Sequence, residues 1–377
     1  MTIPFDEIRR WMFERALPYW GEKGLDAKFG GFLEELTPDG QETDVPFKRV
    51  RVTCRQIYVF SHAHMMGWAP GDALAKRGYD YLIAKAWQGD ERGWARRLTR
   101  QGDVLDGTPD LYDIAFALFA LAWRYRASGD VDALKWAHRT LDFVEQKMRA
   151  PNGIGFWHEL PPKGPRVQNP HMHLFEASLA AFDASKDQRF LDRASEVAKL
   201  FRERFFDGHT LGEYFTEDFS RVAGDDGHRA EPGHQLEWAW ILANYQGHTG
   251  IDLQREATTL VDFAEQHGID PDSQAVFDEV RDDGSPLRKS SRTWPNTERI
   301  KGNLALFERY GRDTRTHVAA SARLLLDRYC QANGSWIDQF DDAGEPTTLI
   351  APTSTFYHVF LAFAEILRLE PKLAQLG

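Results

Sequence analysis

The sequence has few cysteines, no long apolar run and no excess of positive charge. Its 377 residues include only two cysteines, Cys54 and Cys330, and neither belongs to a CxxC motif. This excludes a disulfide framework or a thiolate zinc site, and a reducing compartment, the cytoplasm, is expected. No apolar run approaches the roughly 20 residues of a membrane-spanning helix. The N-terminal segment carries acidic residues, so it is interpreted as neither a signal peptide nor a transit peptide.

The charge balance limits the partners that the protein is expected to bind. The formal net charge is −11, with 42% hydrophobic and 27% charged residues, which is a globular composition. A negative surface repels phosphate backbones and anionic lipids, so neither nucleic acid nor a membrane is an expected partner.

Short segments that carry an aromatic residue recur along the chain at nearly constant spacing. They contain Phe32, Trp94, Phe156, Tyr214, Phe277 and Trp336, which are separated by 62, 62, 58, 63 and 59 residues. A near-constant period indicates a repeat architecture. Pro- and Gly-rich joints punctuate the repeats, but none is long enough to be an interdomain linker. We therefore expect one domain that spans residues 1–377.

The apolar spacing predicts helices throughout the chain. The predicted pairs are 5–20 with 54–67, 71–87 with 109–127, 130–149 with 171–184, 187–205 with 233–248, 252–267 with 295–310, and 314–332 with 355–369. Stretches such as DLYDIAFALFALAWRYRA have the dense apolar pattern of a buried helix. Twelve helices in six pairs predict an all-α fold, a closed (α/α)6 barrel. The second helix of each pair would lie inside, with short β segments in the connecting loops.

Side chains that are unusual for a packed core stand near the starts of the predicted inner helices. They are Arg55, Tyr112, His173, His234, Trp294 with Glu298, and His358. Because they have similar offsets in repeats arranged around a ring, we expect them to converge at one end of the barrel. His358 alone, in an apolar helix, would be interpreted as structural. Since buried polar groups need partners, the joint positions favour a pocket.

The histidine pairs also have a structural interpretation. His171 and His173 form an HxH pair, but positions i and i+2 of a helix point to different faces. No acidic cluster is expected to complete a metal site there, so neither a metal nor a cofactor is predicted. His173 with Glu176, and His234 with Glu237, share a helix face at spacing i, i+3, and each pair could be only a satisfied helix turn.

At these helix starts the sequence resembles the N-acylglucosamine 2-epimerase superfamily. The similar motifs are RVTCRQIYVFSHA with Arg55, LYDIAFAL with Tyr112, QNPHMHLFEA with Asn169, His173 and Glu176, PGHQLEWAWIL with His234 and Glu237, TWPNTERIKG with Trp294 and Glu298, and STFYHVFLA with His358. They follow in order from about residue 30 to 365, and the resemblance implies the (α/α)6 barrel. The family's N-acyl-hexosamine epimerases commonly lack the HxH helix start, so the chain is most similar to the family's mannose isomerases.

The resemblance implies metal-independent proton transfer by histidine. His234 and His358 would form the acid–base pair, and Arg55 would hold the enediolate oxygen. His173 and Glu237 would bind hydroxyl groups, with Glu237 also tuning His234. The other predicted substrate-binding residues are Asn169, Tyr112, Trp294, Glu176 and Glu298.

The expected reaction interconverts D-mannose and D-fructose through a cis-enediol(ate) intermediate, because histidine takes and gives protons near neutral pH. The same residues would allow 2-epimerisation of the N-acylglucosamine or cellobiose type. The chain could also be an (α/α)6 glycoside hydrolase, which needs two opposed carboxylates, or a non-catalytic sugar-binding protein. The expected partner is a small sugar, the protein being a monomer or homodimer, with the loops at about 40–52 and 160–170 closing the pocket.

Overall fold

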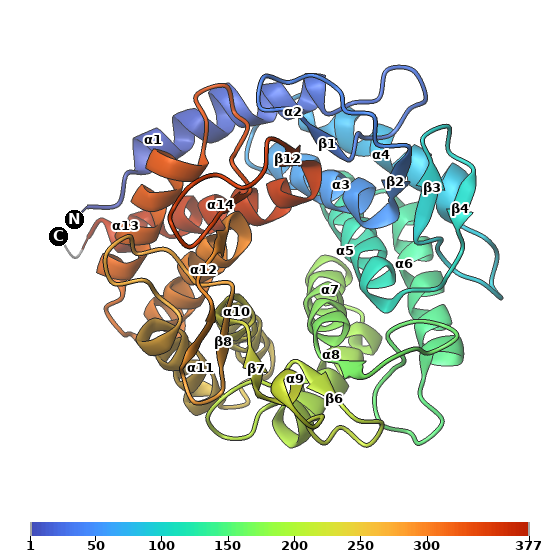
Figure 1. Ribbon diagram of the computed structural model, residues 1–377. Coiled ribbons are helices and arrows are strands. Elements are labelled where there is room, and N and C mark those ends of the chain that lie inside the picture. Colours follow the sequence, from blue (N-terminus) through green and yellow to red (C-terminus); the bar gives the residue numbers. More distant parts are fainter. Residues whose placement is uncertain (1, 376–377) are drawn as a thin grey trace.

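Two concentric rings of helices make up the computed structural model, which describes residues 2–375 (Figure 1). The inner ring consists of α3 (Val50–Met65), α5 (Leu111–Ser128), α7 (Asn169–Ser185), α10 (Pro232–Thr249), α12 (Thr293–Tyr310) and α14 (Phe356–Leu373). These helices contact one another in chain order, and α14 packs back onto α3, which closes the ring. The predicted (α/α)6 barrel is confirmed.

The outer ring is formed by the helices that alternate with the inner ones along the chain. It begins with α1 (Phe5–Arg10), which continues through the π-helical segment η1 (Trp11–Ala16) into α2 (Leu17–Lys23). The others are α4 (Gly71–Ala86), α6 (Val131–Phe143) with η2 (Val144–Met148), α8 (Gln188–Leu200) with η3 (Phe201–Phe205), α11 (Gln254–His267), and α13 (Arg315–Leu324) with η4 (Leu325–Tyr329). Two short helical pieces, α9 (Asp225–His228) and η5 (Thr353–Thr355), lie in loops.

The apolar pattern of each helix explains the ring to which it belongs. Helix α5 is buried along nearly its whole length, since it packs against inner neighbours on both sides and an outer helix behind. Helix α8 instead alternates buried residues such as Phe190, Ala194 and Val197 with more exposed polar ones, as a helix with one face in solvent must. Helix α3 begins at Val50, four residues before the predicted start, because Val50 and Val52 also pack inside.

Short antiparallel strands join neighbouring repeats at the end of the barrel where the inner helices begin. The sheets are β2 (Phe47–Arg49), β3 (Arg97–Thr99) and β4 (Val104–Asp106); β5 (Arg166–Val167) and β6 (Tyr214–Phe215); β7 (Arg229–Ala230), β8 (Glu279–Arg281) and β9 (Pro286–Arg288); β10 (Ser291–Arg292) and β11 (Gln339–Phe340); and β1 (Glu35–Leu36) with β12 (Ala351–Pro352). In the last of these, Glu35 is paired with Pro352 and Leu36 with Ala351, so the first and last repeats are joined directly.

An isolated antiparallel β-bridge follows each outer helix and marks the equivalent position in every repeat. The bridges pair Leu25 with Phe32, Trp87 with Trp94, Arg149 with Phe156, Phe206 with Leu211, Ile269 with Val276, and Cys330 with Trp336. The predicted markers Tyr214 and Phe277 are therefore wrong by three residues and one residue. The bridge position requires a buried apolar side chain, which Leu211 and Val276 supply without an aromatic ring.

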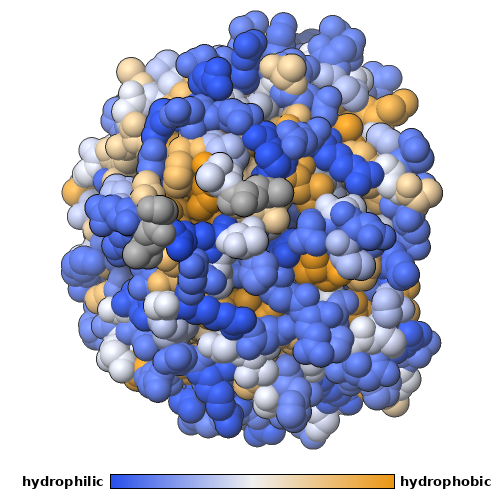
Figure 2. Space-filling model, turned by 90° about the vertical axis from the view of Figure 1, so that its left-hand side faces the viewer, coloured by the Kyte–Doolittle hydropathy of each residue, from blue (hydrophilic) through white to orange (hydrophobic). Residues whose placement is uncertain are grey.

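The surface gives no sign of a membrane-spanning segment. Figure 2 shows a face on which hydrophilic side chains predominate and hydrophobic ones form only small separate areas. Among the helices of residues 2–375, none is long and apolar enough to cross a membrane.

Candidate active site

A cavity of about 430 Å³ opens at the end of the barrel where the inner helices begin. It is lined by eight of the ten predicted site residues: Arg55, Tyr112, Asn169, His173, His234, Glu237, Trp294 and His358. Each comes from the first turns of an inner helix, and together they come from all six. The structure thus brings together side chains that lie more than 300 positions apart in the sequence, from Arg55 to His358.

His358 is held by a carboxylate that lies behind it. Its Nδ1 is 2.8 Å from Oε1 of Glu298, while the imidazole borders the cavity. Burial lowers the pKa of His358 well below its usual range, and the positive charges of Arg55 and Lys301 lower it further. His358 is therefore neutral at physiological pH, so it can accept a proton at Nε2 when Nδ1–H donates to Glu298.

His234 has the opposite charge state. Its Nδ1 lies 3.0 Å from Oε2 of Glu213, and Glu231 is 3.8 Å away. Burial opposes a charge on the ring, but the carboxylates of Glu213 and Glu231 outweigh burial and raise the pKa of His234 to about 9. On the other side of the ring, Nε2 lies 3.1 Å from Nδ2 of Asn169, and a half-turn of this amide would present its oxygen to an imidazolium N–H. In its charged form His234 is therefore able to donate a proton.

Trp294 connects the two histidines across the cavity. Its ring centroid lies 5.1 Å from that of His234 and 5.7 Å from that of His358. The two imidazoles thus contact the same wall of the same cavity. Both imidazoles therefore border a space that can hold one sugar-sized molecule.

Arg55 supplies a fixed positive charge beside His358. Its Nη2 donates to the hydroxyl of Tyr112 at 2.7 Å and its Nη1 donates to the carbonyl of Ser354 at 3.2 Å. The guanidinium also lies 4.3 Å from the ring centroid of Phe116. Among residues 2–375 it has no carboxylate partner, so its charge remains available to an oxyanion in the cavity.

A fully buried lysine lies beneath the cavity. The Nζ of Lys301 is 2.6 Å from Glu298 and 3.8 Å from Glu237. Burial opposes its charge, but Glu298, Glu237 and Glu176 outweigh burial and raise the pKa of Lys301. Burial and the charge of Glu237 raise the pKa of Glu298, the residue that positions His358, well above its usual range, and the ammonium group of Lys301 opposes this rise.

Two of the predicted substrate-binding residues do not line this cavity. Glu298 is fully buried behind His358 and holds it in place. Glu176 is bonded to Nδ1 of His173 at 3.3 Å and accepts a hydrogen bond from the Tyr357 hydroxyl at 2.6 Å. It borders a different cavity, because it lies one turn further along α7. The prediction that these two residues contact the substrate is thus corrected to a positioning role.

Glu237 was predicted to tune His234, and its charge does help raise the pKa of that residue. The two residues share a helix face, but the hydrogen bond of Nδ1 goes to Glu213 from the preceding loop. Glu237 contributes only through its charge at longer range. Its carboxylate lines the cavity and lies near Lys301.

The two histidines of the HxH pair point in different directions, as expected for positions i and i+2 of a helix. His171 points away from the cavity, where its Nδ1 lies 3.1 Å from the Val167 carbonyl and its Nε2 accepts from the Phe156 N–H. His173 faces the cavity. The HxH pair is therefore not a joint metal site.

Carboxylates nevertheless gather around the histidines, contrary to the sequence-based expectation, because the barrel brings them from neighbouring helices. The groups within 4.8 Å are His173, Glu176 and Glu237; Glu213, Glu231 and His234; and Glu237, Glu298 and His358. In each group the histidine Nδ1 is already hydrogen-bonded to a carboxylate, and Lys301 supplies positive charge to the third. A metal-free site stays a prediction.

The sequence-based prediction did not include Glu213, because this residue can be recognised only from its position relative to the β-bridge of its repeat. Two residues after the bridge position, four repeats have an acidic side chain that binds the start of the next inner helix. Glu34 accepts from the Arg49 N–H, Glu213 from the Glu231 N–H at 3.3 Å, Asp278 from the Arg292 N–H at 3.1 Å, and Asp338 from the Thr355 hydroxyl at 2.7 Å. The signal was present in the sequence, but the displaced markers obscured it.

The loop before α14 forms more of the rim than the loops that were predicted to close the pocket. Residues 350–355 contribute Ile350, Pro352, Ser354 and Thr355. The predicted segments 40–52 and 160–170 contribute Arg49 and Asn169 respectively. Because β12 is paired with β1, this rim is tied to the first repeat.

Comparison with known proteins agrees with this geometry. Residues 30–362 match the family model of N-acylglucosamine 2-epimerase (GlcNAc 2-epimerase). The chain is 32% identical over 373 residues to a mannose-6-phosphate isomerase of Rhizobium meliloti (strain 1021), covering 96% of each. It is 25% identical over 329 residues to a cellobiose 2-epimerase of Bacteroides fragilis, covering 81% of this chain and 82% of the relative.

A solved structure has the same fold over nearly the whole chain. A crystal structure of D-mannose isomerase superposes with a TM-score of 0.87 at 22% identity, covering 96% of each chain. Together with the family match over most of the sequence, this shows that the chain belongs to the N-acylglucosamine 2-epimerase family of sugar isomerases and epimerases.

Proposed function

We propose that the protein is an aldose–ketose isomerase of a free hexose, with D-mannose and D-fructose as its substrate pair. The observation that carries the proposal is the pair of histidines in one cavity with opposite pKa shifts, His358 lowered and His234 raised. A neutral base and a charged acid are what an enolisation needs, since one group takes a carbon-bound proton while the other serves an oxygen.

The proposed steps conserve every proton. Nε2 of neutral His358 removes the proton from C2 of the open-chain aldose, while His234 donates a proton to the C1 oxygen. The cis-enediol(ate) forms next to Arg55, whose charge stabilises the developing oxyanion. His358 then returns its proton to C1, and His234 recovers one from the C2 hydroxyl as the ketone forms.

The remaining cavity residues bind and orient the sugar in this proposal. Glu237 and His173 accept or donate hydrogen bonds to hydroxyl groups, and Asn169 and Tyr112 complete the polar wall. Trp294 offers a flat face to the C–H groups of the sugar. We propose that the whole ring is one catalytic domain, because the site needs all six inner helices.

The charges of the cavity support a free sugar over a sugar phosphate. Of its arginines, Arg49 is paired with Glu34 at 2.7 Å and Arg292 with Asp278 at 2.8 Å. The lining also includes Glu35, Glu231, Glu237 and Asp338. A phosphate group would meet this excess of carboxylates, so we do not transfer to this chain the phosphorylated substrate that names the Rhizobium relative.

Epimerisation at C2 is the second candidate, and the same observation favours it. If the imidazolium of His234 returns a proton to C2 from the face opposite His358, the stereocentre is inverted. The cellobiose 2-epimerase among the relatives is consistent with this outcome.

The experiment that tests the proposal follows D-mannose by NMR in D₂O with a metal chelator present. Fructose deuterated at C1 is the expected product, and D-mannose 6-phosphate should react far more slowly. Glucose deuterated at C2 would show the epimerase instead. No exchange at C1 or C2 of mannose, lyxose or cellobiose would contradict both candidates.

Two further expectations remain part of the proposal. Cys54 and Cys330 are both free and buried, which supports a reducing compartment, the cytoplasm. The active site is complete within one chain, which suits a monomer as well as a homodimer.

A further inference from the structure

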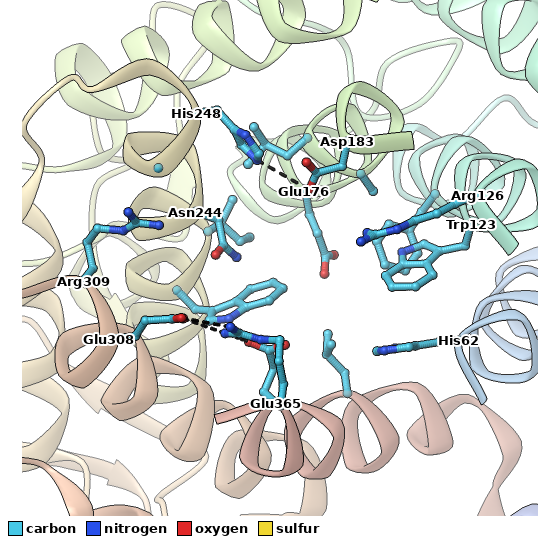
Figure 3. Close-up of a pocket in the computed structure, with 18 residues that line it drawn as sticks. His62, Trp123, Arg126, Glu176, Asp183, Asn244, His248, Glu308, Arg309 and Glu365 are labelled. Carbon is cyan, nitrogen blue, oxygen red and sulfur yellow. Dashed lines mark hydrogen bonds and ion pairs between the residues drawn. The ribbon is translucent and has the colours of Figure 1, made fainter. Parts of the chain in front are cut away.

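A second cavity, of about 350 Å³, opens at the opposite end of the barrel, where the inner helices end (Figure 3). It is formed by the later turns of all six inner helices and shares no lining residue with the catalytic cavity. Its volume falls in the range of small-molecule sites. Apart from Glu176, none of its lining residues has a role in the sugar chemistry proposed above.

Three acidic residues of this cavity are paired with cations. Asp183 lies 3.2 Å from Nζ of Lys186. Glu308 and Glu365 both bind Arg368, at 2.6 and 2.8 Å, and Glu308 also lies 3.1 Å from Nζ of Lys372. These carboxylates are therefore neutralised by protein groups and leave little negative charge for a ligand to meet.

Two exposed arginines are left without such partners. Among residues 2–375, neither Arg126 nor Arg309 has a carboxylate within ion-pair distance, although both line the cavity. In Figure 3 they lie on opposite sides of the cavity, Arg126 on α5 and Arg309 on α12, with Asn244 and Glu176 between them in this view. The uncompensated charge of the cavity is thus positive and divided between two sides.

The innermost carboxylate does not cancel this charge. Both oxygens of Glu176 are occupied, one by the Tyr357 hydroxyl at 2.6 Å and the other by His173 at 3.3 Å. The positive charge of Lys301 lies nearby and helps lower the pKa of Glu176. The negative charge of Glu176 is therefore directed toward the barrel interior.

The wall between the two arginines has the character of a sugar site. His62 stacks on Trp123 with ring centroids 4.4 Å apart, and Trp240 adds a second indole. Burial, together with Arg126 and Arg368, lowers the pKa of His62 to about 3, so its ring is neutral. The indole Nε1 of Trp123 has no hydrogen-bond partner within residues 2–375. Aromatic faces with unused polar groups suit a hydroxylated ring.

We propose that this cavity is a second ligand site for a sugar that carries phosphate groups. Guanidinium groups bind phosphate through paired, charge-assisted hydrogen bonds. A hexose bisphosphate has one phosphate group for each of the two arginines and hydroxyl groups for Asn244, which lies between them in Figure 3. The site is distinct from the catalytic cavity in position and in charge.

The test is titration calorimetry of the full-length protein with fructose 1,6-bisphosphate. We expect saturable binding at one site per chain, which excess D-mannose does not displace, and weaker binding of fructose 6-phosphate. The double variant Arg126→Gln/Arg309→Gln should lose at least tenfold in affinity. Arg77→Gln, which removes an exposed arginine of α4, is the matched control and should bind as the wild type does.

A second variant keeps the shape of the cavity and changes only its charge. Asn244→Asp adds a carboxylate between the two arginines and should also weaken binding by at least tenfold. Unaltered kcat with D-mannose in all three variants would show that the fold is intact. The proposal is overturned by no saturable binding at millimolar ligand, by affinity that these substitutions leave unchanged, or by displacement with excess D-mannose.

Discussion

His234 and His358 are the same kind of side chain, but their neighbours give them different charges. His234 lies against two carboxylates, which raise its pKa to about 9. His358 is hydrogen-bonded to the carboxyl group of Glu298, which contacts Lys301, and it faces the positive charge of Arg55. The proposed division into acid and base therefore depends on the loop before α10 for His234 and on residues from other repeats for His358.

Replacement of His358 by Asn should remove turnover and leave the fold intact. The variant retains a polar group near Glu298 but cannot accept the C2 proton, so kcat should fall by about 10² to 10⁴. Isomerase assays together with circular dichroism measure both effects. His209→Asn, at an exposed loop position, is the control. Activity like that of the wild type in His358→Asn would contradict its assignment as the base.

The pH profile should depend on Glu213. The proposed mechanism requires protonated His234, so kcat/KM should decrease as pH rises through about 9. In Glu213→Gln the main source of the raised pKa is lost, so this decrease should move to lower pH. Exposed Glu217→Gln is the matched control and should leave the profile unchanged. A profile in Glu213→Gln that still falls near pH 9 would rule out His234 as the acid.

The same shift affects stability in a defined direction. Because the pKa of His234 is raised above its ordinary value of 6.5, its protonation stabilises the folded protein fully below that pH. This contribution is lost as pH rises through about 9. It should be smaller in Glu213→Gln, since the shift itself is smaller.

The sequence predicted which residues line the cavity better than it predicted their hydrogen-bond partners. Helix starts in a ring must converge, so Arg55, His173, His234 and His358 could be placed from spacing alone. The partner Glu213 has equivalents in other repeats, but this periodicity was obscured because the markers Tyr214 and Phe277 were misplaced. The partner Lys301 approaches His358 from a neighbouring helix, and such a contact between repeats leaves no periodic signal.

At the scale of elements, the positions of the long helices could be predicted from the sequence. For the strands, only their presence in the connecting loops could be predicted, and not their positions. Helices of 14 to 18 residues, such as α11 and α12, have several turns in which apolar spacing can be recognised. Strands of two or three residues, such as β1 and β2, are too short for an alternating pattern. The markers Tyr214 and Phe277 were misplaced for the same reason, because the equivalent position in each repeat is fixed by a single β-bridge.

The first turn of α4 packs so closely on α3 that a glycine is required there. A Cβ atom at Gly71 would lie 2.4 Å from the Phe60 carbonyl oxygen and 2.8 Å from the His64 nitrogen, and both are backbone atoms. Gly71→Ala should therefore reduce the free energy of unfolding by about 1–3 kcal/mol. Denaturation curves compare it with Arg77→Ala on the exposed side of the same helix. Equal denaturation midpoints for the two variants would mean that α4 moves to accommodate the added methyl group without loss of stability.

At the scale of the whole molecule, the ring is closed by contacts between its first and last repeats. Trp20 stacks on Trp336 with centroids 4.5 Å apart, and its Nε1 donates to the Gly334 carbonyl at 3.1 Å. Strand β1 pairs with β12 at the rim of the catalytic cavity. The position of the rim loop therefore depends on closure.

Trp20→Ala should lower stability and activity together. Removal of a fully buried indole costs about 3–5 kcal/mol, and here it also loosens the contact between the first and last repeats. We expect a lower thermal midpoint and a higher KM for the sugar. Trp157→Ala, at a partly exposed loop position, is the control for loss of an indole elsewhere. A variant with a lower midpoint but an unchanged KM would show that the rim does not depend on closure.

The buried Lys301, with Glu176 and Tyr357, fills the axis of the barrel between its two openings. The two cavities are consequently closed off from each other along the barrel axis. In the proposed reaction the aldose and the ketose use the same opening, so each competes with the other for the site. In the same proposal a longer saccharide extends outward past residues 350–355, and the width of the opening there limits the size of the substrate.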